Sequence, residues 1–297
     1  MLQALARRAV LISIFVFALL LSWSNVAVGQ QAQHTLTGEF RYHRNFHSNF
    51  LPANRDVIVY LPPGYETDQQ KRYPVLYMQD GQNIFDGATS FIQGNEWRVD
   101  ETAQALIQSG AIEPIIIVGV YNTSDRIDEY TPARDPKYKQ GGKADLYGRL
   151  LVEELKPLID TTYRTLRDAR HTGLGGSSLG GLVSLYLGLK YPQTFSRLAV
   201  VSPSVWFADR TIVRDVLTLK MKPSVRLWVD IGMNEGQDEL DSIQTADDAR
   251  LLRDALIARG WKSGSDLSYT EIEGAQHNEP AWAKRVEPIL KYLFPKG

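Results

Sequence analysis

One serine in the sequence has the surroundings of a hydrolase nucleophile. The segment 176–180 reads GSSLG and fits the pattern G-x-S-x-G with Ser178 at its centre. A frame centred on Ser177 fails because it would need glycine in place of Leu179. A short strand before this motif and an apolar helix after it would form a sharp turn that exposes the serine hydroxyl at the carboxyl edge of a sheet. A glycine-rich turn that serves packing alone is the simpler alternative.

A serine hydroxyl needs a general base, normally histidine, and chain position separates the five candidates. Four of them precede the motif and are expected away from the carboxyl edge of the sheet: His34, His43, His47 and His171. His277 follows the last expected strand, in a loop that can bring a base over that edge. We therefore predict that His277 is the base, although a lone loop histidine is often just exposed.

The third member of such a site is a carboxylate that orients the imidazole and stabilises its charged form. In α/β-hydrolases the chain order is serine, acid, histidine, so the acid should follow the strand expected at 225–231. Glu235 and Asp238 both lie there, and we favour Glu235. Asp230 lies within the strand, where the pattern does not fix the direction of its side chain. Acidic loop residues that are only solvated are the alternative.

An oxyanion hole needs two backbone N–H groups. Leu179, which follows the serine, is expected to supply one of them. The other is expected from the loop 79–83, which reads QDGQN after a strand at 74–78. Glycine at position 81 would let the backbone turn toward the substrate, so the amide of Gln82 is the expected donor. An ordinary β-turn would also explain Asp-Gly.

The elements that must position these residues are short apolar runs that alternate with longer segments of helical period. This alternation predicts an α/β-hydrolase fold with a mostly parallel sheet and helices on both faces. Strands, several of them apolar on both faces, are expected at 57–61, 74–78, 115–120, 172–176, 198–201, 225–231 and 267–272. Helices are expected at 97–109, 145–166, 179–190, 246–259 and 280–293, with a kink or division at Pro288. An N-terminal antiparallel hairpin is expected to join 38–46 to 57–61.

The composition suits a globular enzyme and excludes several other classes. The chain has 297 residues, 43% of them hydrophobic, a net charge of −1 and no long basic run, so no nucleic-acid partner is expected. It has no cysteine, which excludes disulfides and thiolate metal sites, and no histidine pair stands at ligand spacing. We expect neither a metal nor a cofactor.

The first 29 residues have the three parts of a secretory signal peptide. Arg7 and Arg8 precede an apolar run at 9–23, and small residues follow at 27–29. The run is short for a membrane span of about 20 residues, although an uncleaved anchor is the alternative. Removing the two arginines would change the net charge from −1 to −3. We expect a single catalytic domain at 30–297, secreted or periplasmic, with no stable membrane insertion after cleavage.

Several segments together resemble the esterase D family of α/β-hydrolases, also called the "putative esterase" family. They are VIVYLPPGY at 57–65, YPVLYMQDG at 73–81, RIDEYTP at 126–132, the GSSLG motif, and HNEPAW at 277–282. The resemblance covers essentially the whole mature chain. It implies a triad of Ser178, Glu235 and His277, with oxyanion amides at Gln82 and Leu179. The family includes feruloyl, acetylxylan and siderophore esterases, S-formylglutathione hydrolases and mycolyl transferases, so the resemblance leaves the substrate open.

Other residues are candidates for a pocket rather than for the chemistry. The aromatic candidates for lining an acyl or aromatic site are Trp97, Tyr130, Trp206 and Trp282, of which at least two are expected to pack in the core instead. Arg126 and Glu129 could form an ion pair or hold the substrate.

The leading hypothesis is hydrolysis of a small-molecule or glycan-linked carboxylic ester through an acyl-enzyme. Acyl transfer to another hydroxyl shares the same intermediate. A non-catalytic binding protein on this fold is the third alternative, and such a protein would be expected to lack the serine or the histidine.

Overall fold

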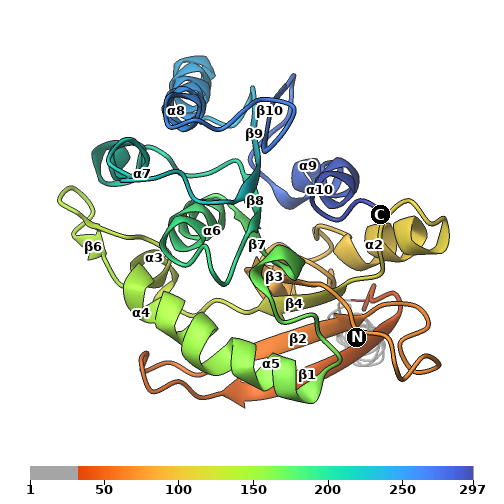
Figure 1. Cartoon of the computed structure of the whole chain (residues 1–297). Coiled ribbons are helices and arrows are strands. Elements are labelled where there is room, and N and C mark those ends of the chain that lie inside the picture. The colour runs from red at the N-terminus through yellow and green to blue at the C-terminus, as the bar shows by residue number, and fades with distance from the viewer. Residues whose placement is uncertain (1–32, 297) are drawn as a thin grey trace, which may run out of the picture. The chain divides into compact units, whose positions relative to one another are not determined.

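The computed structural model describes residues 33–296, and the structural statements below concern these residues. The expected signal segment, residues 1–29, lies outside them. Eight described strands form one sheet in the order β1-β2-β4-β3-β7-β8-β9-β10 (Figure 1). Their bounds are Glu39–Phe46 for β1, Arg55–Leu61 for β2, Val75–Gln79 for β3, Ile116–Val120 for β4, Thr172–Ser177 for β7, Arg197–Val201 for β8, Arg226–Gly232 for β9 and Leu267–Ile272 for β10.

The pairing of the strands confirms the expected mixed sheet. β1 pairs with β2 and β2 with β4 in antiparallel register, and every later pairing is parallel. The expected N-terminal hairpin is therefore present. A separate two-stranded sheet joins β5 (Arg134–Asp135) to β6 (Gln140–Gly141).

Alternating side chains on the strands build two apolar cores, one on each face of the sheet. In β2, Val57 and Val59 belong to one core, and Ile58 and Tyr60 belong to the other. Successive side chains of a strand point to opposite faces, so a strand that is apolar throughout is stable only when both faces are covered. The expectation that the central strands are buried on both faces is confirmed.

Helices cover both faces (Figure 1). One face carries α4, α5, α6 and α7, and the other carries α2, α9 and α10. Their bounds are Val99–Gln108 for α2, Ala144–Arg149 for α4, Lys156–Thr162 for α5, Leu179–Lys190 for α6, Phe207–Leu217 for α7, Glu279–Ala283 for α9 and Val286–Leu293 for α10. The remaining helices are α3 (Arg126–Glu129), α8 (Glu239–Ala258) and the short turns η1 (Gly81–Asn83), η2 (Leu150–Leu155) and η3 (Ala169–His171). None of the described helices has the length and apolar character that a bilayer span requires.

Three helix predictions need correction, and one helix was not predicted. The segment expected as one helix at 145–166 contains a π-helical stretch, η2, and ends at Thr162. α8 begins at Glu239 rather than at 246 because Asp238 caps it. The C-terminal helix divides at Lys284 and Arg285, and Pro288 lies in the first turn of α10, where a missing N–H costs little. The sequence pattern does not predict α7.

The carboxyl ends of the parallel strands meet at one edge of the sheet. The chain leaves β7 at Ser178, β9 just before Glu235, and β10 just before His277. The predicted nucleophile, acid and base therefore lie on loops of a single edge, next to the loop that follows β3.

Candidate active site

Ser178 lies at a tight turn between β7 and α6. Its backbone has φ 58° and ψ −125°, a conformation that residues with a Cβ seldom adopt. Neighbouring backbone groups hold it there, since its N–H donates to Val201 O at 3.0 Å and its carbonyl accepts from Ser204 N at 3.1 Å. A Cβ at Gly176 would come within 2.9 Å of the Gln79 side chain, so the motif glycine permits this close packing.

The hydroxyl of Ser178 faces a cavity. Its Oγ lies 3.2 Å from the hydroxyl oxygen of Ser204. Among the described residues there is no hydrogen bond between Ser178 and His277, although both line the same two chambers. Nucleophile and base often lie farther apart in a substrate-free site than during reaction.

His277 and Glu235 are in direct contact. His277 Nδ1 lies 2.9 Å from Glu235 Oε2, and the imidazole packs edge-on against Trp282 with ring centroids 5.0 Å apart. The Glu235 side chain is 1% exposed, whereas that of His277 is 34% exposed. A buried carboxylate on Nδ1 would leave Nε2 free to exchange protons at the cavity.

The other oxygen of Glu235 is held by three donors. Glu235 Oε1 accepts from Gly232 N at 2.6 Å, from Ser202 Oγ at 2.6 Å and from Arg285 at 3.1 Å. Burial opposes ionisation, but the hydrogen bonds from His277 and Ser202 and the charges of His277 and Arg285 lower the pKa of Glu235 below its usual range. Glu235 is therefore built to stay ionised and fixed in orientation.

Arg285 links this acid to a second buried carboxylate. Its guanidinium donates to Asp230 at 2.8 Å, and Asp230 also accepts from Trp228 Nε1 at 2.6 Å. The side chains of Arg285 and Asp230 are 3% and 0% exposed. Sequence reasoning missed Arg285, which lies between α9 and α10. No local motif there indicates that its side chain contacts residues at the ends of distant strands.

Asp238, the alternative candidate for the acid, has a structural role. Asp238 accepts from Asp241 N at 2.9 Å and caps α8. Arg126 and Glu129 do not pair with each other, because Arg126 binds Asp80 at 2.7 Å and Glu129 binds the buried Arg55 at 2.9 Å.

The two predicted oxyanion donors lie at the starts of helical turns. Leu179 is the first residue of α6, and Gln82 lies in η1, where early N–H groups have no partner within the turn. Asp80, with φ 56°, makes the turn after β3. We expected glycine at position 81 because it would let the backbone turn, and this reason is wrong. A Cβ at Gly81 would lie 2.5 Å from the backbone of Gly119, so glycine is needed there because the two backbone segments pack closely.

Two chambers meet at Ser178 and His277. One, of about 440 Å³, is bordered by Glu235, Trp206 and the start of α8. The other, of about 340 Å³, is bordered by Gln82, Trp97 and Trp282. Three of the four aromatic pocket candidates thus line a chamber.

Tyr130 does not line either chamber. It is fully buried, its ring packs against Tyr147 at 5.1 Å, and its hydroxyl accepts from Asp80 N at 3.3 Å. The prediction of a pocket role for Tyr130 is therefore wrong, because the ring fills the core beneath α3.

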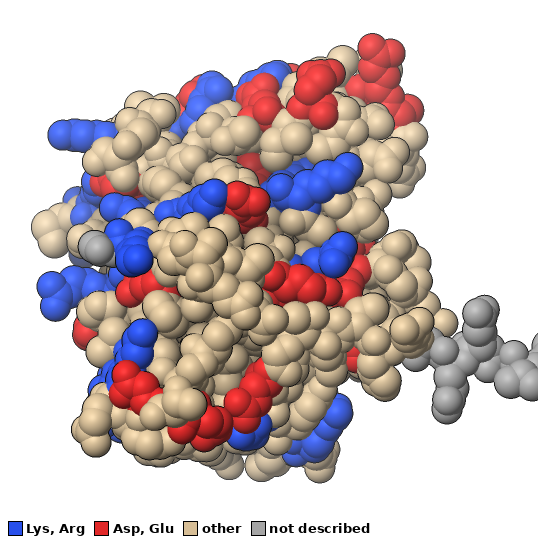
Figure 2. All heavy atoms as spheres, turned by 90° about the vertical axis from the view of Figure 1, so that its right-hand side faces the viewer, with Lys and Arg blue, Asp and Glu red and all other residues tan. Residues whose placement is uncertain are grey.

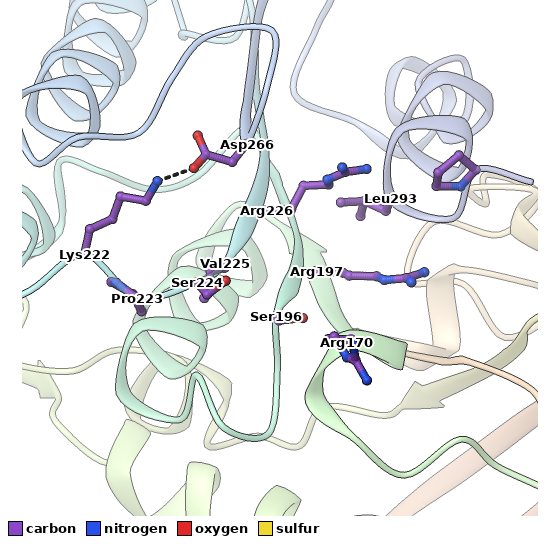
Figure 3. A pocket seen from close by; sticks show the side chains of 11 residues that line it. Arg170, Ser196, Arg197, Lys222, Pro223, Ser224, Val225, Arg226, Asp266 and Leu293 are labelled. Carbon is purple, nitrogen blue, oxygen red and sulfur yellow. Dashed lines mark hydrogen bonds and ion pairs between the residues drawn. The ribbon is translucent and has the colours of Figure 1, made fainter. Parts of the chain in front are cut away.

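A third cavity, of about 620 Å³, lies at the opposite, amino edge of the sheet. Figure 3 shows its basic side chains, with Lys222 paired to Asp266 and Arg226 beside Leu293. Neither Ser178 nor His277 lines it, so this cavity is separate from the predicted nucleophile and base.

Known proteins resemble this chain along most of its length. The model of the family described as "Putative esterase" matches residues 48–293. An uncharacterized Bacillus subtilis protein, YbbA, is 27% identical over 84% of this chain and 96% of its own. The endo-1,4-beta-xylanase/feruloyl esterase of Xylanibacter ruminicola is 27% identical over 80% of this chain and 29% of its own. The ferri-bacillibactin esterase BesA of B. subtilis is 25% identical over 75% of this chain and 80% of its own.

Solved structures share the fold. An IroE-like serine hydrolase from Shewanella oneidensis superposes with a TM-score of 0.69 at 24% identity, over 86% of this chain and 80% of that one. A ferulic acid esterase superposes with a TM-score of 0.65 at 19% identity, over 86% of this chain and 98% of that one.

Proposed function

The chain belongs to the "Putative esterase" family, and we propose that it is a serine carboxylic-ester hydrolase that works through an acyl-enzyme. The observation that carries the proposal is the meeting of Ser178 and His277 at one cavity, with Glu235 buried behind the imidazole. This is the set of groups that acyl transfer to a serine requires.

In the proposed reaction Ser178 Oγ attacks the ester carbonyl while His277 Nε2 takes its proton. The amides of Gln82 and Leu179 stabilise the negative charge that forms on the carbonyl oxygen. His277 then gives the proton to the departing alcohol, which leaves an acyl group on Ser178. Water, deprotonated by His277, attacks this acyl-enzyme and releases the acid. Glu235 stabilises the imidazolium in both halves of the reaction.

The larger chamber supports an ester with a hydroxylated, uncharged alcohol, such as a glycan. Two half-exposed aromatic rings, Tyr138 and Trp206, stand 5.8 Å apart at the larger chamber. Hydrogen-bonding side chains complete its wall, namely Gln237, Asp241, Gln244, Thr245 and Asp248. The described residues that line this chamber include no lysine or arginine. An anionic iron-siderophore ester would find carboxylates in this chamber instead of cations, and Arg126, which lines the smaller chamber, is already paired with Asp80, so among the relatives the feruloyl esterase is the better guide.

We also propose that the protein is exported. The support is the sequence pattern of residues 1–29 and the absence of cysteine, which lets the domain fold in either redox environment.

Turnover of p-nitrophenyl acetate and of a feruloylated sugar tests the activity. Ser178→Ala should lower kcat by at least about 10³-fold because the nucleophile is lost. Ser196→Ala is the matched control, since Ser196 lies in the cavity at the opposite edge and should keep full turnover. Undiminished turnover by the Ser178 variant would refute the proposed function. Faster hydrolysis of a catecholate siderophore ester than of the feruloylated sugar would refute the substrate preference alone.

A further inference from the structure

Three carboxylates gather beside the start of α2, outside the two catalytic chambers. Glu96, Asp100 and Glu101 each bring one oxygen within 4.8 Å of the other two. Glu96 is 7% exposed and Asp100 is fully buried. Like the pair Asp230 and Glu235 at the proposed active site, this group contains buried acids. It differs from that pair because no buried arginine contacts its carboxylates in the described residues.

Each carboxylate keeps a buried oxygen without a hydrogen-bond partner in the described part of the chain. These atoms are Glu96 Oε2, Asp100 Oδ1 and Glu101 Oε2. The near cation is Arg98, whose Nε lies 3.6 Å from Glu101 Oε1, but its side chain is 65% exposed and water screens its charge. A carboxylate is costly to keep ionised when it is buried without a partner, and a bound cation would favour the ionised form of these three groups.

The opposite oxygens are fixed by the segment 34–37. Thr35 Oγ donates to Glu96 Oε1, at 2.5 Å, and Thr37 N donates to Asp100 Oδ2 at 2.6 Å. Glu96 and Asp100 therefore each have one oxygen that holds the orientation and one that is free to bind. In a preorganised cation site, hydrogen bonds of this kind fix the orientation of the carboxylates that bind the ion.

A cavity of about 830 Å³ connects the group with the surface between α2 and α10. Thr35, Glu96, Arg98 and Glu101 line it on the side of α2, and Lys284 and Glu287 line it on the side of α10. On this face of the molecule acidic and basic side chains are interspersed (Figure 2). The cavity reaches Glu96 and Glu101, whereas Asp100 is fully buried and does not line it.

We propose that Glu96, Asp100 and Glu101 bind a divalent cation of the Ca²⁺ type, which ties the segment 34–37 to α2. The donors are all oxygens, and Ca²⁺ takes such ligands at about 2.4 Å, so oxygens up to about 4.8 Å apart can share one ion. Mg²⁺ needs shorter bonds in a strict octahedron and gives up its water reluctantly, so it should bind more weakly. The site does not depend on the proposed esterase activity.

The site would act on the catalytic edge through the backbone. Trp97, next to Glu96, lines a catalytic chamber, and its N–H donates to Asn83 O at 3.0 Å. Val99 N likewise donates to Ile84 O at 3.0 Å. An ion bound at the carboxylates would therefore stabilise the loop that carries Gln82 without touching the reacting atoms.

Thermal unfolding of the protein, first treated with EGTA and then titrated with CaCl₂ or MgCl₂, tests the site. With an affinity typical of extracellular calcium modules, Ca²⁺ at about 10 mM should raise Tm by about 3–8 °C, and Mg²⁺ should raise it less. Tb³⁺ used as a luminescent calcium substitute should give emission excited through nearby aromatic rings, and Ca²⁺ should displace it.

The double variant E96Q/D100N should lose the Ca²⁺ response. Its amide oxygens can still accept from Thr35 and Thr37, and without added cation it should be at least as stable as the wild type because neutral amides replace two desolvated ionisable groups. E101Q, at the less buried position, provides a second test should the double variant fold poorly. E287Q, across the same cavity, is the control and should keep the full response. The proposal is overturned if the wild type shows no Ca²⁺-dependent Tm rise, or if E96Q/D100N and E101Q show the same rise and the same Tb³⁺ emission.

Discussion

Two groups of buried carboxylates in this molecule have opposite surroundings. At the carboxyl edge of the sheet, which carries the proposed active site, Asp230 and Glu235 share the guanidinium of Arg285, and Glu235 also accepts from Gly232 N. Beside α2, Glu96 and Asp100 face each other and Glu101, each with a buried oxygen that no described group satisfies.

The pKa of Glu235 shifts in the opposite direction from the pKa values of Glu96 and Asp100, whereas burial raises the pKa of Asp230 as well, despite its contact with Arg285. The pKa of Glu235 is pulled below its usual range despite burial, because donors and positive charges outweigh the cost of desolvation. The pKa values of Glu96 and Asp100 rise to about 7 and about 8, because desolvation is not compensated. Burial alone therefore does not say what a carboxylate does. In the first group Arg285 and His277 contact the carboxylates, whereas in the second group each carboxylate has a buried oxygen that no described residue contacts by a hydrogen bond.

The largest expected effect concerns Glu235. In E235Q the neutral amide can neither stabilise the imidazolium of His277 nor fix its tautomer, so kcat/KM should fall about 10²–10⁴-fold. Ester hydrolysis under initial-rate conditions measures this loss. D238N is the matched control, because Asp238 caps α8 and should leave turnover within about twofold of the wild type. A greater loss in D238N than in E235Q would show that the wrong acid has been chosen.

The second largest expected effect is the loss of stability when Arg285 is replaced. R285Q leaves two buried carboxylates without their cation and should lower the free energy of unfolding by about 3–5 kcal/mol, as measured in urea. The double variant D230N/R285Q removes a charge from each side and should recover part of the loss. E96Q/D100N, measured without cations, should lose no stability. If R285Q costs no more than E96Q/D100N, the contrast between the two carboxylate groups is wrong.

The smallest expected effect is on acid sensitivity. Because the folded-state pKa of Glu235 is lowered, its ionised form stabilises the fold above the ordinary glutamate pKa of 4.5, and this stability is lost as the pH falls through the lowered value. Below about pH 4.5 the wild type should therefore lose unfolding free energy more steeply than E235Q. Urea unfolding at successive pH values measures both slopes, and equal slopes would remove Glu235 as a source of acid sensitivity.

The sequence was sufficient to locate the strands of the main sheet and the loops that carry the predicted site residues. Apolar runs locate strands because a strand buried on both faces must be apolar throughout, and β10 has the bounds that its sequence pattern predicts. Chain order then placed Glu235 and His277 close enough to hydrogen bond.

What sequence reasoning missed depends on contacts between distant segments. Arg285 lies 50 residues from Glu235 and 55 from Asp230, and nothing in its helix shows that it faces them. Nothing in the sequence around Tyr130 distinguishes it from an aromatic residue that lines a pocket, but its ring packs in the core. The carboxylates beside α2 escaped notice because acidic residues in the first turn of a helix are normally explained by the helix dipole.

Covalent labelling of Ser178 tests the central claim most directly. After treatment with a fluorophosphonate, intact-mass analysis should show one adduct per chain, and peptide mapping should locate it on Ser178. Labelling should be abolished in S178A and strongly slowed when His277 is replaced by alanine. An unlabelled protein that still hydrolyses esters, or an adduct on another residue whose formation parallels the loss of turnover, would contradict the account.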